Sequence, residues 1–359
     1  MRILLASLVA LAAGCNGAPA LAQSPAPGTG LSARVQLLGN LSMDQTSQRG
    51  LALALPGADS PRLWFKTTYD TLSARLPAVT GTGAVPNVHM DLSQTLFGAE
   101  LRRGAWLVGL AGAAAAARGQ QDAITFGQAI AGAAGPYSNA KSIRYDIDPR
   151  RIETEAYAIS PYVAFAATKR AILTGAIGYT RRDFRLRPGS QTITVTQEFG
   201  PGWQALGLPA SKSSTMRYAG LGTATTDGTV STDIAANLVV PIGETGVILA
   251  GRLGYRHAST WATPFTGTAT GVQTTYLGAQ AFYRHGRFTP FARVQWEYSN
   301  PTTGTAQDAA KYPRDAVYLT AGVDYRMTES IAGGLSVMTQ EANPSITRRQ
   351  VALNLRYNF

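Results

Sequence analysis

The sequence is poor in cysteine, in charged residues and in long apolar runs. Among 359 residues there is one cysteine, Cys15, and only 15% are charged. A single cysteine cannot form an intrachain disulfide, so a disulfide-stabilised scaffold is excluded. The longest mostly apolar stretch, residues 104–117, is half alanine and shorter than the roughly 18 to 20 residues a membrane-spanning helix needs. A helical membrane protein is therefore not expected.

The chain is basic, but its basic residues are dispersed. The formal net charge is +11 at pH 7, and no run of five or six basic residues occurs. No recognisable nucleic-acid-binding module is present, so we expect no nucleic-acid partner. An excess of Lys and Arg without such a module favours anionic lipids or anionic solutes as partners.

The N-terminus has the pattern of a secretory signal. Arg2 precedes a mostly apolar run, Ile3–Ala13, and Ala20-Leu21-Ala22 provides a small-x-small cleavage site. We therefore assign residues 1–22 to a signal peptide, whose removal leaves a mature chain without cysteine. The alternative is a lipidation box, Leu11–Cys15, in which Cys15 would carry lipid.

The last nine residues alternate with a period of two. Their apolar positions are Val351, Leu353, Leu355, Tyr357 and Phe359, and the positions between them are polar or alanine. This period predicts a β-strand with one apolar and one polar face. The stretch resembles the closing strand of Gram-negative outer-membrane β-barrels, and that resemblance implies that the assembly machinery reads Phe359. The alternative is an ordinary C-terminal strand of a β-sandwich.

From residue 62 onward, alternating segments recur between short turns and longer connections. We expect an all-β fold, a transmembrane antiparallel up-and-down barrel of twelve strands over residues 62–359. In the strand at 88–102 the apolar residues switch parity, which predicts a β-bulge. Two connections, residues 119–151 and 188–225, are expected to be long external loops, with a possible ribbon at 193–196. Residues 23–61 form a lead segment whose part 31–55 is either a luminal plug or an extra hairpin, which would raise the strand count to fourteen.

Several motifs are similar to the translocator barrel of autotransporters. They are Leu63-Trp64-Phe65, Leu96–Leu101, Trp106–Gly109, Thr289–Val294 and the terminal Phe359. The resemblance covers residues 62–359 and implies a bacterial outer-membrane location. It also implies contact with outer-membrane lipids, lipopolysaccharide and the assembly machinery. Only residues 23–61 precede this region after the signal, so a passenger domain is not expected.

The polar parity of the expected strands collects many charged residues. Basic residues exceed acidic ones on this face, so we expect a wet, net-positive lumen that favours anions. The alternative is a closed lumen cross-braced by Arg–carboxylate pairs, because twelve strands leave little room for an open channel. The expected lumen-lining residues are Lys66, Arg182, Arg252, Arg256, Arg293, Arg326, Arg348, Arg356, Asp70, Asp324 and Glu297.

Candidate catalytic chemistry is sparse. The three histidines have no metal-ligand spacing, so neither a metal nor another cofactor is expected. His257 and Ser259 share the lipid-facing parity and are similar to the His-x-Ser pair of outer-membrane lipid A deacylases, but no acid is identifiable to orient His257.

The sequence therefore predicts a non-enzymatic pore or translocator for small solutes or an exported polymer, and it does not identify the solute. A structural or surface-binding barrel that uses its long external loops is the alternative. A lipid hydrolase that uses His257 and Ser259 is a remote third.

Overall fold

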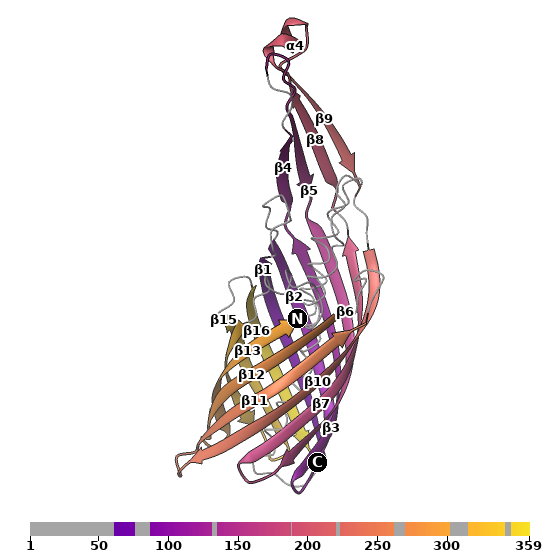
Figure 1. The fold of residues 1–359 in the computed structure, drawn as a ribbon. Helices are drawn as coiled ribbons and strands as arrows, with labels where there is room; N and C mark the ends of the chain where they lie inside the picture. Colours follow the sequence, from indigo (N-terminus) through magenta and orange to yellow (C-terminus); the bar gives the residue numbers. More distant parts are fainter. Residues whose placement is uncertain are drawn as a thin grey trace.

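A computed structural model describes residues 61–75, 87–130, 135–187, 189–219, 223–261, 270–301, 315–341 and 346–359. Twelve of its strands form a closed barrel in which every neighbouring pair is antiparallel (Figure 1). The expected twelve-stranded antiparallel barrel is confirmed. The barrel strands are β1 (Pro61–Arg75), β2 (Asn87–Arg103), β3 (Trp106–Gln121), β6 (Arg150–Ala166), β7 (Ala171–Arg187), β10 (Thr223–Ile242), β11 (Val247–Thr260), β12 (Thr270–Tyr283), β13 (Phe288–Pro301), β14 (Asp315–Arg326), β15 (Ile331–Glu341) and β16 (Ile346–Asn358).

The barrel closes by pairing its first and last strands. β1 lies between β2 and β16, and its register with β16 runs from Arg62 opposite Asn358 to Ala74 opposite Ile346. Both edges of β1 and of β16 are thus occupied, which leaves no place in the wall for a further hairpin. The fourteen-stranded alternative is therefore wrong. Residues 31–55, Cys15 and the expected signal peptide lie outside the described residues.

The expected β-bulge in β2 is also wrong. Its pairing with β1 runs without interruption from Asn87 opposite Arg75 to Leu101 opposite Pro61. Met90 and Leu92 are buried on the inner face, whereas Phe97 and Leu101 are exposed on the outer face. The apolar residues change sides while the strand stays regular, because part of the inner face of this barrel is itself apolar.

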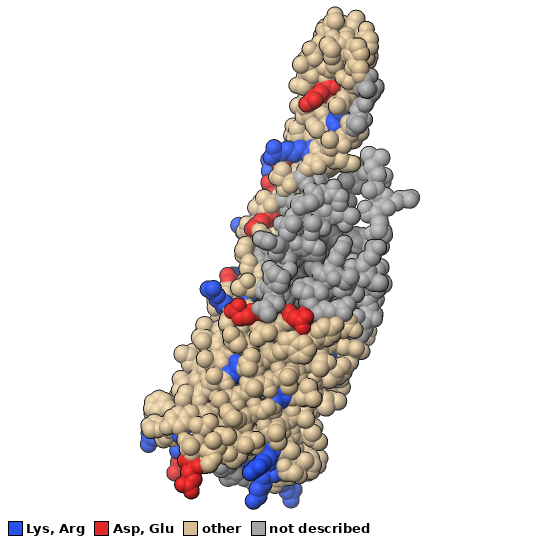
Figure 2. Space-filling model, turned by 60° about the vertical axis from the view of Figure 1, so that its left-hand side comes forward, with Lys and Arg blue, Asp and Glu red and all other residues tan. Residues whose placement is uncertain are grey.

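The outer face of the barrel is an apolar belt. Outward-facing side chains such as Leu110, Ile177 and Leu253 are each at least half exposed, as a lipid-facing wall requires. On the face shown in Figure 2, a broad band of the wall carries few charged residues, which gather above and below it. Several aromatic residues of the barrel strands are also exposed outward, among them Tyr157, Tyr179, Tyr255, Tyr283 and Tyr357.

The two connections expected to be loops instead form a second sheet. Its strands are β4 (Ile124–Ile130), β5 (Lys141–Ile147), β8 (Gln191–Glu198) and β9 (Ser211–Tyr218), paired in the order β4-β5-β8-β9. The short helix α4 (Pro201–Ala205) lies at its tip. Figure 1 shows this sheet, which we name the extension, standing on the barrel rim above β3, β6, β7 and β10. The expectation of two long loops is therefore wrong, and residues 193–196 belong to β8.

In the described part of the chain, no helix is long and apolar enough to cross a membrane.

Candidate functional site: the inner wall of the barrel

One wall of the lumen carries a cluster of paired charges, which we name the Asp233 cluster. Asp233 on β10 is fully buried and accepts hydrogen bonds from Arg256 Nε at 2.9 Å and from the Tyr276 hydroxyl at 2.7 Å. Arg252 lies 3.6 Å from the same carboxylate, and Arg256 also approaches Glu297 on β13 at 3.6 Å. The cluster therefore spans the four neighbouring strands β10, β11, β12 and β13.

A glycine makes room for the aromatic member of this cluster. Gly254 lies directly opposite Tyr276, and a Cβ atom at Gly254 would overlap the phenol ring. The ring therefore lies over β11 between two arginines, whose guanidinium carbons are 4.9 Å (Arg252) and 5.1 Å (Arg256) from its centroid. Such contacts add cation–π attraction to the ion pairs. The spacing Arg252-x-Gly254-x-Arg256 thus places one aromatic ring between two positive charges.

A second cluster crosses the closure of the barrel. Asp70 on β1 is fully buried and accepts hydrogen bonds from Arg348 Nε at 2.8 Å and from the Gln350 amide at 2.9 Å. Both donors lie on β16. Because these side chains are inside the wall, the first and last strands are joined by a charge-assisted contact in addition to their backbone ladder.

A third cluster links β1, β2 and β6. The Tyr162 hydroxyl donates to Glu100 at 2.9 Å and accepts from Trp64 Nε1 at 2.9 Å, and Arg62 lies 3.9 Å from Glu100. β3 passes between β2 and β6, and Tyr162 reaches across it because Gly109 carries no side chain. A Cβ atom there would overlap the tyrosine ring.

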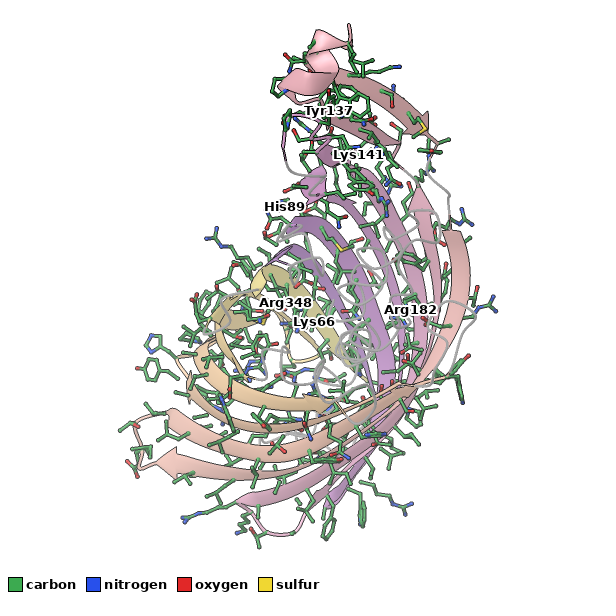
Figure 3. All side chains as sticks on the ribbon, turned by 45° about the horizontal axis from the view of Figure 1, so that its top comes forward. Lys66, His89, Tyr137, Lys141, Arg182 and Arg348 are labelled. Atoms are coloured by element: carbon green, nitrogen blue, oxygen red, sulfur yellow. The ribbon has the colours of Figure 1, made fainter. Side chains whose placement is uncertain are left out.

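The remaining expected lumen residues lie at different heights of the inner wall. Arg182 is 1% exposed and forms a 2.5 Å ion pair with Asp227 of β10. Lys66, Arg293 and Arg356 are half-buried on the inward parity of their strands, and Arg326 is exposed at the short-turn end. Asp324 accepts a hydrogen bond from the Asn354 amide at 3.3 Å. Figure 3, viewed obliquely from the extension, shows Lys66, Arg182 and Arg348 along the inside of the wall.

On the inner wall as a whole, basic side chains outnumber acidic ones. The inward-facing basic residues are Arg62, Lys66, Arg102, Arg150, Arg182, Arg252, Arg256, Arg293, Arg326, Arg348 and Arg356. The inward-facing acidic residues are Asp70, Glu100, Asp227, Asp233, Glu297 and Asp324. The expected lumen residues did not include seven members of the three clusters, namely Arg62, Trp64, Glu100, Tyr162, Asp233, Tyr276 and Gln350, nor Asp227, the partner of Arg182. Their parity marks them as inward, but only the register between strands reveals their partners.

These clusters are shielded from solvent. Asp70 and Asp233 are fully buried, and Arg256 is 1% exposed. A wide water-filled channel would leave such wall residues accessible. The residues around them therefore shield these side chains from solvent.

His257 and Ser259 both face outward on β11. Ser259 is exposed and His257 is half-buried. The residues opposite His257 are Thr232 and Gln273, so its cross-strand neighbours include no carboxylate. Within the described residues, the Nδ1 atom of His257 has no hydrogen-bond partner. Likewise, no group of three or more His, Cys, Asp or Glu side chains there is placed to hold a metal.

The extension has two chemically different faces. One is rich in hydroxyl groups, with Thr196 and Ser213 2.9 Å apart across β8 and β9. The other carries the buried Ile147 and Ile193, with the exposed Met216 directly opposite Ile193. At the tip, Trp203 donates its Nε1 hydrogen to the Tyr137 carbonyl at 2.7 Å.

One ionisable group of the extension is clearly perturbed. The Thr125 hydroxyl donates to Asp146 at 2.7 Å, and the Arg144 guanidinium lies 3.0 Å from the same carboxylate. The hydroxyl, followed by the guanidinium, holds the pKa of Asp146 below its ordinary value.

The outward apolar residues of β16 are exposed, as a lipid-facing strand requires. Val351, Leu353, Leu355 and Tyr357 are between 42% and 53% exposed. Phe359 follows the strand, and its backbone N–H donates to the Pro61 carbonyl at 3.2 Å. An apolar groove of about 680 Å³ opens on the outer face beside this strand, lined in part by Phe97, Gly112 and Leu355.

Comparison with known proteins finds similarity in structure only. No protein-family model and no curated protein matches the sequence. The structure is similar to the translocator domain of the autotransporter NalP from Neisseria meningitidis, with a TM-score of 0.56 and 10% identity over 90% of this chain and 96% of that one. The transport unit of the autotransporter AIDA-I from Escherichia coli aligns with a TM-score of 0.48 and 14% identity over 89% of this chain and 98% of that one. The fold is thus that of an autotransporter translocator barrel.

Proposed function

We propose that this chain is a pore or translocator in the outer membrane of a Gram-negative bacterium, with a lumen that prefers anions. The observation that carries the proposal is a polar, net-positive inner wall enclosed by an apolar outer belt. Such a barrel places a charged passage across the hydrocarbon layer. The NalP domain is described as a translocator, and the shared fold supports the same use here.

The buried charge clusters support a pore that rests closed. The Asp233 cluster brings five side chains of one wall into mutual contact, and the Asp70 cluster ties the closing strands. Passage of a solute or an extended polymer then requires the lumen to open while the wall stays intact. In this proposal, the two lumens that the sequence left open are two states of one barrel: the cross-braced lumen is the closed state, and the anion-selective lumen is the open state.

Planar-bilayer recording tests this proposal. We expect rare openings whose reversal potential in a KCl gradient indicates chloride preference. Replacing Arg326 and Arg356 by Gln removes two inward charges and should shift the reversal potential towards zero. The control, Arg284→Gln with Arg287→Gln, removes two exposed charges at a turn and should leave it unchanged. Absence of channels in every salt would contradict the proposal.

A second candidate function is binding at the cell surface through the extension. The observation that favours it is an ordered four-stranded sheet with a hydroxyl-rich face and with Tyr137, Leu206 and Leu208 exposed near its tip. Replacing residues 122–148 and 189–221 by short turns keeps the barrel strands. Loss of cell adhesion with unchanged channel activity would favour surface binding, and unchanged adhesion would exclude it.

We also propose that the chain is not an enzyme. His257 lacks a neighbouring carboxylate in the described wall, so nothing orients it as a base for Ser259. In cells that express Ser259→Ala, the lipid A acyl chains should match those of wild-type cells by mass spectrometry. A change in acylation would revive the hydrolase alternative.

A further inference from the structure

Arginines gather on the outer face of three neighbouring barrel strands, just below the extension. We name this set the arginine patch, and all of its members are exposed. It comprises Arg118 on β3, Arg151 on β6, and Arg181, Arg185 and Arg187 on β7. All five have the same parity as the lipid-facing residues of their own strands, such as Leu110, Ile159 and Leu173. The patch therefore lies on the outer surface of the barrel and not in its lumen.

The patch begins where the apolar belt ends. Tyr157 lies directly opposite Arg181, and Tyr179 directly opposite Ile159. The strands continue from these tyrosines for about six to eight residues, or roughly 20 Å along the strand, through the arginines. Aromatic residues mark the membrane–water interface of such barrels, so the arginines lie at the height of lipid headgroups and beyond.

Four outward carboxylates, Asp91, Glu153, Glu155 and Asp183, lie among the five arginines and offset part of their charge. Asp183 lies 3.9 Å from Arg181. Glu153 lies directly between Arg118 and Arg185 on the neighbouring strands, but it forms its ion pair with Arg187, at 3.3 Å. Within the part of the chain that the structure describes, Arg118, Arg151 and Arg185 form no ion pair. Arg151 also lies directly opposite Arg187. Two like charges at directly paired positions destabilise a sheet, and an anion between them would remove that cost.

The positive charge is confined to one side of the barrel. At the same end, the outward positions of other strands include Thr226 on β10, Ser259 on β11, Asp315 on β14 and Glu341 on β15. Among the outward side chains described there, only Arg349 on β16 is a further Lys or Arg. The lipid-facing wall is apolar on all sides of the barrel. Burial of apolar side chains in lipid therefore does not explain why the arginines cluster on one side.

We propose that the arginine patch binds the phosphorylated headgroup of lipopolysaccharide, while the acyl chains of the same molecule lie on the apolar wall below. The proposal rests on placement of the barrel in an outer membrane. Exposed Ile159, Leu173 and Ile177 continue directly from the patch towards the membrane centre. Arginine forms bidentate hydrogen bonds with phosphate, and a cluster of arginines can meet more than one phosphate group. A phosphorylated glycolipid thus matches both the charged and the apolar part of this surface.

The binding of purified lipid A to the folded barrel in detergent tests the proposal. The test variant replaces Arg118, Arg151 and Arg185 by Gln, because these three arginines are not held in ion pairs. We expect its affinity for bisphosphorylated lipid A to fall by at least about tenfold. The control replaces Arg170, Arg284 and Arg287 by Gln, which removes the same charge from exposed positions in turns. Its affinity should equal that of the wild type.

Three further measurements distinguish a lipid site from a folding defect and from a general attraction of anions. A triple Lys variant at the same patch positions keeps the charge and should retain most of the binding, which rules out a folding defect as the cause. Dephosphorylated lipid A should bind the wild type as weakly as intact lipid A binds the Gln variant. Inorganic phosphate should compete only at high concentration. Equal affinity of the Gln variant and the wild type, or equally tight binding of inorganic phosphate, would overturn the proposal.

Discussion

Asp233 lies at the centre of the Asp233 cluster on the inner wall. It is fully buried, it accepts two hydrogen bonds, and two arginines share its charge. Removing one partner of such a cluster leaves the others buried and uncompensated, which costs more than the pair itself contributes. The same residue also holds Tyr276 in place over β11.

We therefore expect Asp233→Asn to lower the free energy of unfolding by about 3 kcal/mol. Urea unfolding in lipid vesicles, followed by tryptophan fluorescence, measures this change. The matched control is Asp183→Asn on the outer face, whose carboxylate is exposed and lies 3.9 Å from Arg181. Exposed pairs contribute roughly 0 to 1 kcal/mol. Similar losses in the two variants would show that the cluster does not stabilise the barrel.

Gly109 has a comparable role for Tyr162. A methyl group at this position would overlap the ring that donates to Glu100. We expect Gly109→Ala to destabilise the barrel by about 1 to 3 kcal/mol. On unheated gels the unfolded chain migrates more slowly than the folded barrel, so the two bands measure the folded fraction. Gly251→Ala is the control, because a Cβ atom there meets nothing within 4 Å. A normal folded fraction for Gly109→Ala would show that Tyr162 moves aside without cost.

For the residues of the inner wall, the sequence could predict which face of a strand a side chain lies on, but not which side chain it pairs with. Strand parity identifies Arg252 and Arg256 as inward-facing, and it also places Asp233 on the inner side of β10. The pairing of Arg256 with Asp233 depends on which residues lie opposite each other, and a shift of register would separate them. Gly109 and Gly254 do not reveal which ring crosses them until the register between strands is known.

At the scale of elements, the barrel strands were predictable and the extension was not. The barrel strands alternate over 11 to 20 residues between short turns, whereas the extension strands have seven or eight residues and contain Gly, Ser and Thr. Short polar strands resemble loops in sequence, because each face of a thin sheet outside the membrane can stay polar. The bulge expected in β2 has a different origin, because the apolar Met90 and Leu92 face inward there.

The pH response of the extension follows from Asp146. Its pKa is below the ordinary value because the Thr125 hydroxyl and then Arg144 favour the charged form. The unfolded state therefore binds the proton more readily than the folded state. The charged Asp146 thus contributes to stability in full above about pH 4, and this stabilisation is lost as the pH falls through the lower folded pKa. Hydrogen exchange of the β4–β5 pair should increase in that acidic range. Asp146→Asn should lack this acidic step, and an identical acid response in both proteins would contradict the assignment.

At the scale of the whole molecule, one strand pair turns a curved sheet into a closed wall. β1 and β16 pair along their length, and Arg348 and Gln350 attach to Asp70 inside the wall. Closure leaves the barrel sheet without an edge that could remain unsatisfied in lipid. The N–H of Phe359 adds a bond to Pro61 where the two chain segments meet, and its ring lies 4.8 Å from that of Tyr357 in an edge-on contact.

Phe359 contributes little to this closure through its side chain, which is 63% exposed. If the assembly machinery reads the residue, as the resemblance of the last strand implies, Phe359→Ala should reduce the amount of barrel assembled in cells several-fold. Stability after refolding in vesicles should remain close to that of the wild type. Phe288→Ala is the control, since Phe288 is 53% exposed in the same aromatic girdle and contacts Tyr325 at 4.7 Å between ring centroids. Both rings lie at the lipid interface, but only Phe359 would be recognised by the assembly machinery. Equal assembly of both variants in cells would therefore assign Phe359 to the girdle alone.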